Sequence, residues 1–145
     1  MADSSTDVAD ALRRWAKGMN TTEAATELLI LACDGTFASV DRPWIRPTNH
    51  GYWIDFPAIT EHLGPLSAGE QRLLRIAASI GSDDAPPAPL AEVLTGLDRR
   101  TLHLVLAAIA HAGGSHQQCA IVIEGDGRVL MTREPSLYAW DERAT

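Results

Sequence analysis

Residues 94–114 read LTGLDRRTLHLVLAAIAHAGG, and they predict one long helix that begins after a tight turn. Asp98 is a residue type that caps helix N-termini, and the glycine pair 113–114 favours a helix stop. The apolar residues expected to face inward repeat at helical spacing: Leu102, Val105, Leu106, Ile109 and Ala112. Because Leu104 and several alanines occupy the other faces, segment 98–112 is apolar nearly all round, and we expect it to be the most buried element.

The residues before this helix predict two further helices and a tight turn. Ser67-Ala68-Gly69-Glu70 fits a capping box, in which the Ser oxygen and the Glu carboxylate each accept a free backbone N–H at the helix start. A helix over 68–80 follows, and the polar, proline-rich stretch 82–89 (SDDAPPAP) cannot continue it. A short helix over 90–94 then leads to Gly96, a residue type suited to the turn before the next helix.

Two β-like segments follow the long helix. Residues 119–124 and 128–133 are the predicted strands, and Gly125-Asp126-Gly127 between them suits a hairpin loop because glycine adopts positive φ readily. A helix, a short helix, a tight turn, a helix and a hairpin, in this order, are typical of a winged helix-turn-helix. We therefore expect a winged-helix-like three-helix unit with a C-terminal two-stranded β-hairpin over residues 67–135.

The first half of the chain predicts a helical hairpin and an irregular connector. Residues 6–17 and a segment from Thr21 or Thr22 to Cys33 carry helical apolar spacing. In the connector, prolines separate a short strand over 52–56 from a helical turn over 57–63. The fold class we expect is mainly α (α+β), in one compact domain over 1–145. Its parts are a helical hairpin (1–35) packed on the winged-helix-like unit (67–135), an aromatic, proline-rich connector (36–66) and a tail (136–145).

Composition places the chain among ordinary globular proteins. Of its 145 residues, 46% are hydrophobic and 21% are charged, which excludes a disordered or collagen-like chain. The formal net charge of −7 does not favour nucleic-acid binding. The longest apolar run, 104–110, is too short to cross a bilayer, and the first ten residues are polar, so we expect a cytoplasmic protein without membrane contact. Cys33 and Cys119 are expected to be reduced and buried.

The motifs predict neither a cofactor nor a metal site. Residues 66–72 (LSAGEQR) resemble the signature loop of ABC-type ATPases, but the sequence contains no Walker A segment beside which that loop could act. His116 and Cys119 have a spacing found among metal ligands, and His111 lies nearby, but no paired second half completes a zinc motif. The sequence also has no nucleophile elbow and no Gly-rich dinucleotide turn. We therefore expect a chain that is not an enzyme.

Three large aromatic residues in the connector, Trp44, Tyr52 and Trp53, are our candidates for a partner-binding surface. Aromatic residues make up only 6% of the chain, so their concentration here is notable. Amphipathic rings commonly anchor protein interfaces, although they can equally cover the junction between two helical layers. We expect a small non-catalytic interaction protein that binds an unidentified protein or forms a homo-oligomer.

One alternative is a winged-helix transcriptional regulator. In that interpretation Arg99, Arg100 and His103 enter the major groove of DNA, and Arg128 near the hairpin tip contacts a phosphate. Specific DNA binding depends strongly on phosphate neutralisation. The apolar outer face expected for helix 98–112 and the negative net charge therefore make nucleic acid the less favoured partner.

A second alternative is a small-molecule-binding protein or an enzyme that uses segment 44–56. His50 lies close in sequence to Arg46 and Asp55, and these groups could form a polar pocket with the aromatic rings. Catalysis needs a base and an electrostatic partner within hydrogen-bond reach of each other. Closeness in sequence does not establish that distance.

Three stretches of the chain resemble segments of a family of small uncharacterised proteins from high-GC actinobacteria. They are ALRRWAKGMNTTEAATELLI (11–30), RLLRIAASI (72–80) and the stretch 94–114 quoted above. Because that family carries no assigned activity, the resemblance implies a type of host organism and no chemistry.

Overall fold

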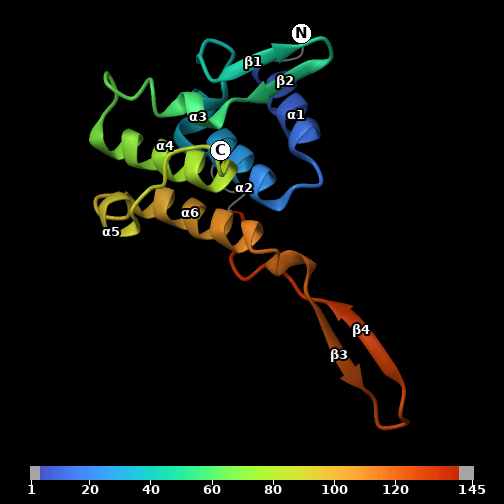
Figure 1. Cartoon of the computed structure of the whole chain (residues 1–145). Helices are drawn as coiled ribbons and strands as arrows, with labels where there is room; N and C mark the ends of the chain where they lie inside the picture. Colours follow the sequence, from blue (N-terminus) through green and yellow to red (C-terminus); the bar gives the residue numbers. More distant parts are fainter. Residues whose placement is uncertain (1–3, 141–145) are drawn as a thin grey trace.

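The structure, a computed structural model, describes residues 4–140 (Figure 1). Its elements are α1 (Ser4–Ala16), α2 (Asn20–Leu31), η1 (Ala32–Ala38), β1 (Ile45–Thr48), β2 (Gly51–Ile54), α3 (Phe56–Ile59), α4 (Ala68–Gly81), α5 (Leu90–Val93), α6 (Arg99–Ala112), η2 (Ser115–Gln117), β3 (Cys119–Ile123) and β4 (Val129–Arg133). The described chain is mixed α/β, and its two sheets are two-stranded and antiparallel. Residues 141–145 of the predicted tail lie outside the described residues.

Helix α2 lies at the centre of the helical part of the chain. It packs against α1, α4 and α6, and Ala24, Ala25, Leu28 and Leu29 on it are fully buried. In Figure 1, α6 lies below α2 and α4, and α1 lies at the upper right beside the β1–β2 hairpin. Helix α1 contacts both α2 and β2. Alanine side chains let neighbouring helices approach closely, so the Ala-rich stretch of α2 suits this central position.

The expectation that 98–112 is the most buried element is therefore wrong. Leu104, Val105 and Ala108 of α6 are buried against the core, but Leu102 and Ile109 are 39% and 47% exposed. An apolar pattern on all faces does not tell which face will be covered. Because α6 lies on the outside of α2, only one side of it is buried.

Local capping interactions set the starts of α4 and α6 as expected. The Ser67 hydroxyl accepts the Glu70 N–H, and the Glu70 carboxylate accepts the Ser67 N–H, which completes the capping box. The Asp98 carboxylate accepts the Thr101 N–H at 2.7 Å. Each of these bonds spans three residues, so the sequence alone suffices to predict them.

The β1–β2 hairpin is only partly anticipated by the sequence. Strand β2 overlaps the predicted strand 52–56, but β1 contains Pro47, which has no backbone N–H for a strand ladder. Proline is tolerated here because it pairs with Tyr52 in a two-stranded sheet whose outer edges are open. In this hairpin Ile45 and Ile54 form a buried cross-strand pair.

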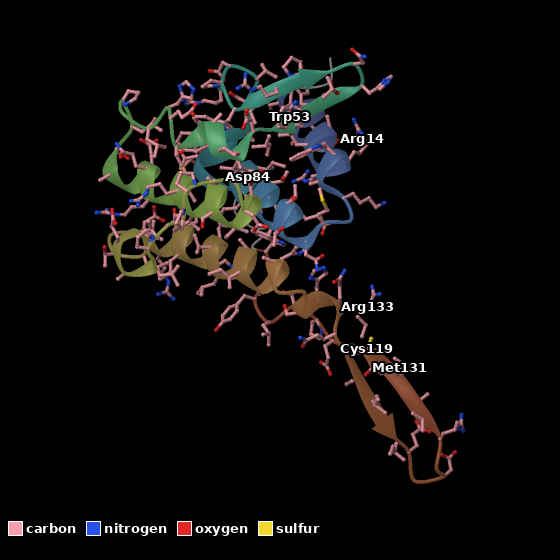
Figure 2. All side chains as sticks on the ribbon, in the orientation of Figure 1. Arg14, Trp53, Asp84, Cys119, Met131 and Arg133 are labelled. Carbon is pink, nitrogen blue, oxygen red and sulfur yellow. The ribbon has the colours of Figure 1, made fainter. Side chains whose placement is uncertain are left out.

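The prediction that both cysteines are buried is wrong, since Cys33 and Cys119 are exposed free thiols. Cys33 follows the end of α2, where Cys33, Asp34 and Gly35 have φ of 51°, 55° and 77°. These left-handed conformations reverse the chain direction after α2. Cys119 begins β3, which leaves the helical part of the chain altogether (Figure 2).

Strands β3 and β4 form a hairpin that projects away from the helices (Figure 1). We call residues 118–134 the hairpin arm. Of the strand residues, Ala120 is half-buried and all the others are exposed. Within residues 4–140, no helix combines the length and apolar character that crossing a membrane requires.

Candidate functional site

The hairpin arm exposes large apolar side chains on both of its faces: Ile121, Val122, Ile123, Val129, Leu130 and Met131. The register pairs Ile121 with Met131 on one face and Val122 with Leu130 on the other. Met131 is 72% exposed and lies well away from the helices (Figure 2). Antiparallel sheets commonly pack one face against a core. Two exposed apolar faces therefore mark the arm as a candidate binding surface.

Charged residues occupy the two ends of the arm. At the tip, the backbone N–H of Arg128 donates to Asp126 at 3.0 Å, and its Nε donates to the same carboxylate at 3.1 Å. These hydrogen bonds hold the pKa of Asp126 below its usual value. At the base, exposed Arg133 ends β4 and exposed Glu134 follows it. The apolar centre of the arm is thus bounded by polar ends, as protein-binding surfaces often are.

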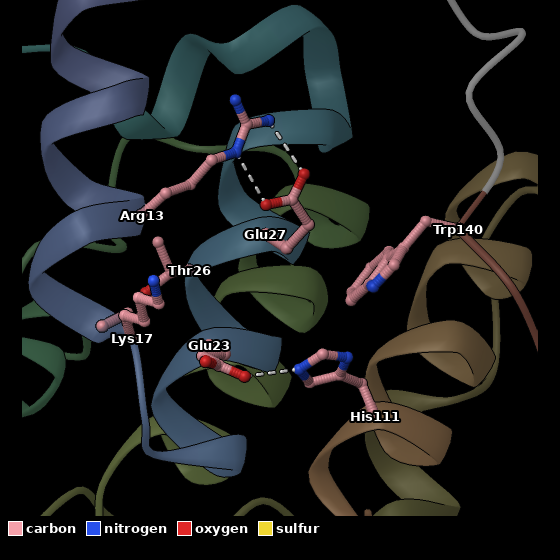
Figure 3. A pocket seen from close by; sticks show the side chains of 8 residues that line it. Arg13, Lys17, Glu23, Thr26, Glu27, His111 and Trp140 are labelled. Atoms are coloured by element: carbon pink, nitrogen blue, oxygen red, sulfur yellow. Dashed lines mark hydrogen bonds and ion pairs between the residues drawn. The ribbon is translucent and has the colours of Figure 1, made fainter. Parts of the chain in front are cut away.

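A second candidate is a pocket of about 340 Å³ between α1, α2 and α6 (Figure 3). Arg13 closes one side of it by donating from Nε and Nη2 to the two oxygens of Glu27, at 2.9 and 2.8 Å. Trp140 lies beside His111 on the opposite side, with ring centroids 6.2 Å apart. The buried Thr26 hydroxyl, which also lines the pocket, has no hydrogen-bond partner within the described chain.

Glu23 and His111 form the polar floor of this pocket, and His116 lies beside His111 without lining the pocket. Burial raises the pKa of Glu23, but hydrogen bonds from the Gly18 N–H and from His111 outweigh it, and the resulting pKa is lowered. The His111 and His116 rings stack at 3.9 Å with 9° between their planes. Burial and, after it, the charge of His111 lower the pKa of His116. Glu23 and His111 lie 88 positions apart in the chain.

The possible ligand atoms of Glu23, His111 and His116 all lie within 4.8 Å of one another. An imidazole binds a metal along a lone pair in its ring plane, and a tetrahedral site needs those directions to converge. The stacked rings of His111 and His116 are nearly parallel, so their lone pairs do not point to one common position. The group is better described as a Glu23–His111 hydrogen bond with the His116 ring stacked on it, and the buried Nδ1 of His116 has no hydrogen-bond partner within the described residues. Cys119, the other sequence candidate, belongs to the hairpin arm.

The structure corrects the prediction that Trp44 is a partner-binding residue. Its side chain is 1% exposed, and its Nε1–H donates to the Phe37 carbonyl at 2.8 Å inside the core. A partner could not reach this ring without unfolding the chain. The neighbouring residues Pro43 and Ile45 do not predict that Trp44 is buried. Its burial depends on η1, whose Phe37 ring packs against the indole.

Tyr52 and Trp53 are half-buried and keep part of their surface exposed. The Trp53 ring lies 6.5 Å from that of Trp15 on α1, and the two line a pocket of about 350 Å³. Tyr52 packs against the core from the same hairpin. That Tyr52 and Trp53 bind a partner stays a prediction. Both rings already contact other residues of the chain.

The polar group expected around His50 is not assembled as one pocket. The Arg46 guanidinium contacts the Asp55 carboxylate at 3.1 Å, and Asp55 also caps α3 by accepting the Ala58 N–H. Asp55 lines the pocket beside Trp53, whereas His50 is exposed in the turn between β1 and β2 and does not line it. The bonds to Arg46 and to the Ala58 N–H thus give Asp55 a structural role.

The four residues proposed to contact DNA lie on two separate parts of the chain. Arg99 and His103 are exposed on α6, but Arg100 donates from Nη2 to the Leu31 carbonyl at 3.2 Å. Arg128 lies at the tip of the hairpin arm, which points away from the start of α6 (Figure 1).

The chain matches no protein-family model, and neither the curated proteins nor the solved structures contain a match to it.

Proposed function

We propose that this chain is a non-catalytic interaction module that binds another protein chain through the hairpin arm. The observation that carries the proposal is the exposure of large apolar side chains on both faces of a hairpin that projects from the helices. A two-stranded hairpin is at best marginally stable alone in water. Binding to a partner would bury its apolar residues and supply the missing strand or surface.

A winged-helix DNA-binding protein is the second candidate. The order α4, α5, α6, β3 and β4 supports it, because this is the element order of a winged helix-turn-helix. The exposed side of α6 nevertheless carries Leu102 and Ile109, and the net charge of the chain is −7. A wing normally lies beside the recognition helix, whereas this hairpin projects away from α6. These features favour protein binding.

Site-specific photo-crosslinking in cells tests the proposal. A photoreactive side chain is placed on the arm at Ile121 or Met131, and as a control at Leu102 or Ile109, which are exposed apolar residues of the helical part. Protein adducts should form at the arm positions and be several-fold fewer at the control positions. Equal labelling at the four positions would reject the arm as the binding element.

The identity of the adduct separates two kinds of partner. A crosslink between two copies of this chain indicates self-association, and a crosslink to a different protein indicates a heterologous partner. Both outcomes support the arm as a binding element, because both require its apolar residues to contact another chain.

A further inference from the structure

The hydrogen bonds of the hairpin arm show which backbone groups are left for another strand. The Glu124 N–H donates to the Arg128 carbonyl, and the Glu134 N–H donates to the Gln118 carbonyl, each at 2.8 Å. In an antiparallel ladder such bonded pairs alternate with pairs whose N–H and C=O groups point outward. The backbone groups of Val129 and Met131 therefore point away from β3 and form the open edge of β4.

Over its first four residues this open edge lacks the features that usually block strand pairing. Natural edge strands carry proline, charged side chains or a bulge. Strand β4 reads VLMTR, so its one charged residue, Arg133, stands at its end, and the β3–β4 register runs without interruption over five residue pairs. The side chains of this strand are exposed along its full length. The edge of β4 is thus able to accept another strand, and the stability of a hairpin improves with a third or fourth strand.

The edge of β4 is complementary to itself when two copies run antiparallel. If Met131 of one copy lies opposite Met131 of the other, all five residues of β4 find a partner. In that register Arg128 of each copy lies directly opposite Glu134 of the other, so two opposite-charge pairs form. Arg128 uses Nε for Asp126, and a guanidinium has further N–H donors on its Nη atoms.

The edge of β3 lacks this complementarity. Centred on Ile121, a pairing of two β3 strands places Glu124 opposite the uncharged Gln118 of the second copy. Shifting the β4 register by one residue toward the turn, to centre on Leu130, places Asp126 opposite Glu134, which is a repulsive pair. Of these three pairings, only the β4 pairing centred on Met131 places opposite charges face to face.

We infer that two copies of this chain join through their β4 edges, antiparallel about a twofold axis at Met131, to form one four-stranded sheet. The inference rests on the proposed function of the hairpin arm and names a second copy of this chain as its partner. A twofold axis makes every contact away from the axis occur twice, so the Arg128–Glu134 pair forms once on each side of Met131. On one face the two Met131 side chains become neighbours, and on the other Leu130 lies beside Thr132 of the second copy.

A charge exchange tests the register. Sedimentation equilibrium of the full chain over a concentration series gives the dimer dissociation constant. Arg128→Glu and Glu134→Arg each create two like-charge pairs and should raise this constant about tenfold or more. The double variant R128E/E134R restores two opposite-charge pairs between the copies but not the Arg128–Asp126 bond within each tip, so its constant should fall well below that of either single variant.

This rescue cannot arise within one chain. Arg128 and Glu134 are six residues apart on one extended strand, or about 20 Å. Recovery in the double variant would therefore report contact between two copies. A double variant as weak as either single variant would overturn the proposed register.

A pair of proline variants tests which edge is used. Met131→Pro removes an N–H that points to the open edge of β4, and Ile121→Pro does the same on β3, so neither removes a bond between β3 and β4. M131P should be monomeric, while I121P should dimerise like the unchanged chain. Circular dichroism and thermal unfolding check that the helical part is folded in both.

Three results would overturn the inference: a monomer at all concentrations, dimers unaffected by M131P, or dimers lost only in I121P. A monomeric chain whose arm still crosslinks to a different protein rejects the second copy as partner and leaves the proposed function standing. A monomeric chain without arm crosslinks rejects both. The two failures are therefore distinguishable.

Discussion

The ring of Phe56 lies so close to Gly81 that a Cβ atom built on this glycine would come within 2.6 Å of the ring. Phe56 is the first residue of α3, and Gly81 is the last residue of α4. The Phe56 side chain is buried in the core cluster, so it has little room to move away. The absence of a side chain at position 81 thus sets how closely α3 and α4 approach.

Gly81→Ala should destabilise the chain by about 1–3 kcal/mol, because the added methyl group overpacks a filled contact. Gly69→Ala is the matched control in the same helix, since its Cβ would meet nothing within 4 Å. Alanine has the higher helix propensity, so this control should be neutral or stabilising by up to about 1 kcal/mol. Urea unfolding followed by circular dichroism measures both. Equal stability of the two variants would show that the Phe56 ring can yield.

Trp44→Phe should destabilise the chain by about 1–3 kcal/mol. The substitution keeps an aromatic ring but removes the Nε1–H that satisfies the buried Phe37 carbonyl, which is then left without its donor. Trp53→Phe, on a half-buried residue of the neighbouring hairpin, should cost less than about 1 kcal/mol. Thermal and urea unfolding compare the two. An equal loss in both variants would contradict the role assigned to the indole hydrogen bond.

Removing the cap of α6 should lower stability in a pH-dependent way. The Thr101 N–H donates to Asp98 and lowers the pKa of this carboxyl below its unfolded value. The charged cap therefore contributes stability above the unfolded pKa, and this contribution is lost as pH falls through the lower folded pKa. At neutral pH, Asp98→Ala should cost about 1 kcal/mol.

Asp98→Asn is the control for this pH dependence, because asparagine caps helices without titrating. The stability difference between D98N and the unchanged chain should shrink or reverse as the pH falls from neutral to about 3. Urea unfolding at a series of pH values measures it. A difference independent of pH would show that the Asp98 charge does not contribute to the cap.

The pKa of His116 should respond in opposite directions to changes at its two charged neighbours. Burial and the charge of His111 lower this pKa, and the charge of Glu23 raises it. His111→Ala should therefore raise the pKa of His116, since it both uncovers the ring and removes a positive neighbour. Glu23→Gln should lower it further. Proton NMR titration of the ring resonances measures both variants, and shifts of the same sign would contradict the electrostatic assignment.

The elements of this fold follow from interactions within a few residues. The Ser67–Glu70 capping box, the Asp98 cap and the Gly125-Asp126-Gly127 loop each act over three or four positions, so the starts of α4 and α6 and the β3–β4 hairpin were predictable. β1 is not predictable from the sequence, because Pro47 has no N–H for a strand ladder and only its pairing with Tyr52 shows that an open edge accommodates it.

Which surfaces are covered was settled by contacts between residues distant in sequence. The apolar residues at helical spacing on α6 include both buried Val105 and exposed Ile109. The position of α2 determines which of these side chains is covered. Trp44 is buried because η1 packs over it, and the Glu23–His111 bond joins positions 88 residues apart. The two β-like segments of the hairpin arm predict a sheet but not its projection into solvent. Local chemistry thus determined the helices and strands by itself, whereas burial and exposure came from tertiary packing, because they depend on which elements meet.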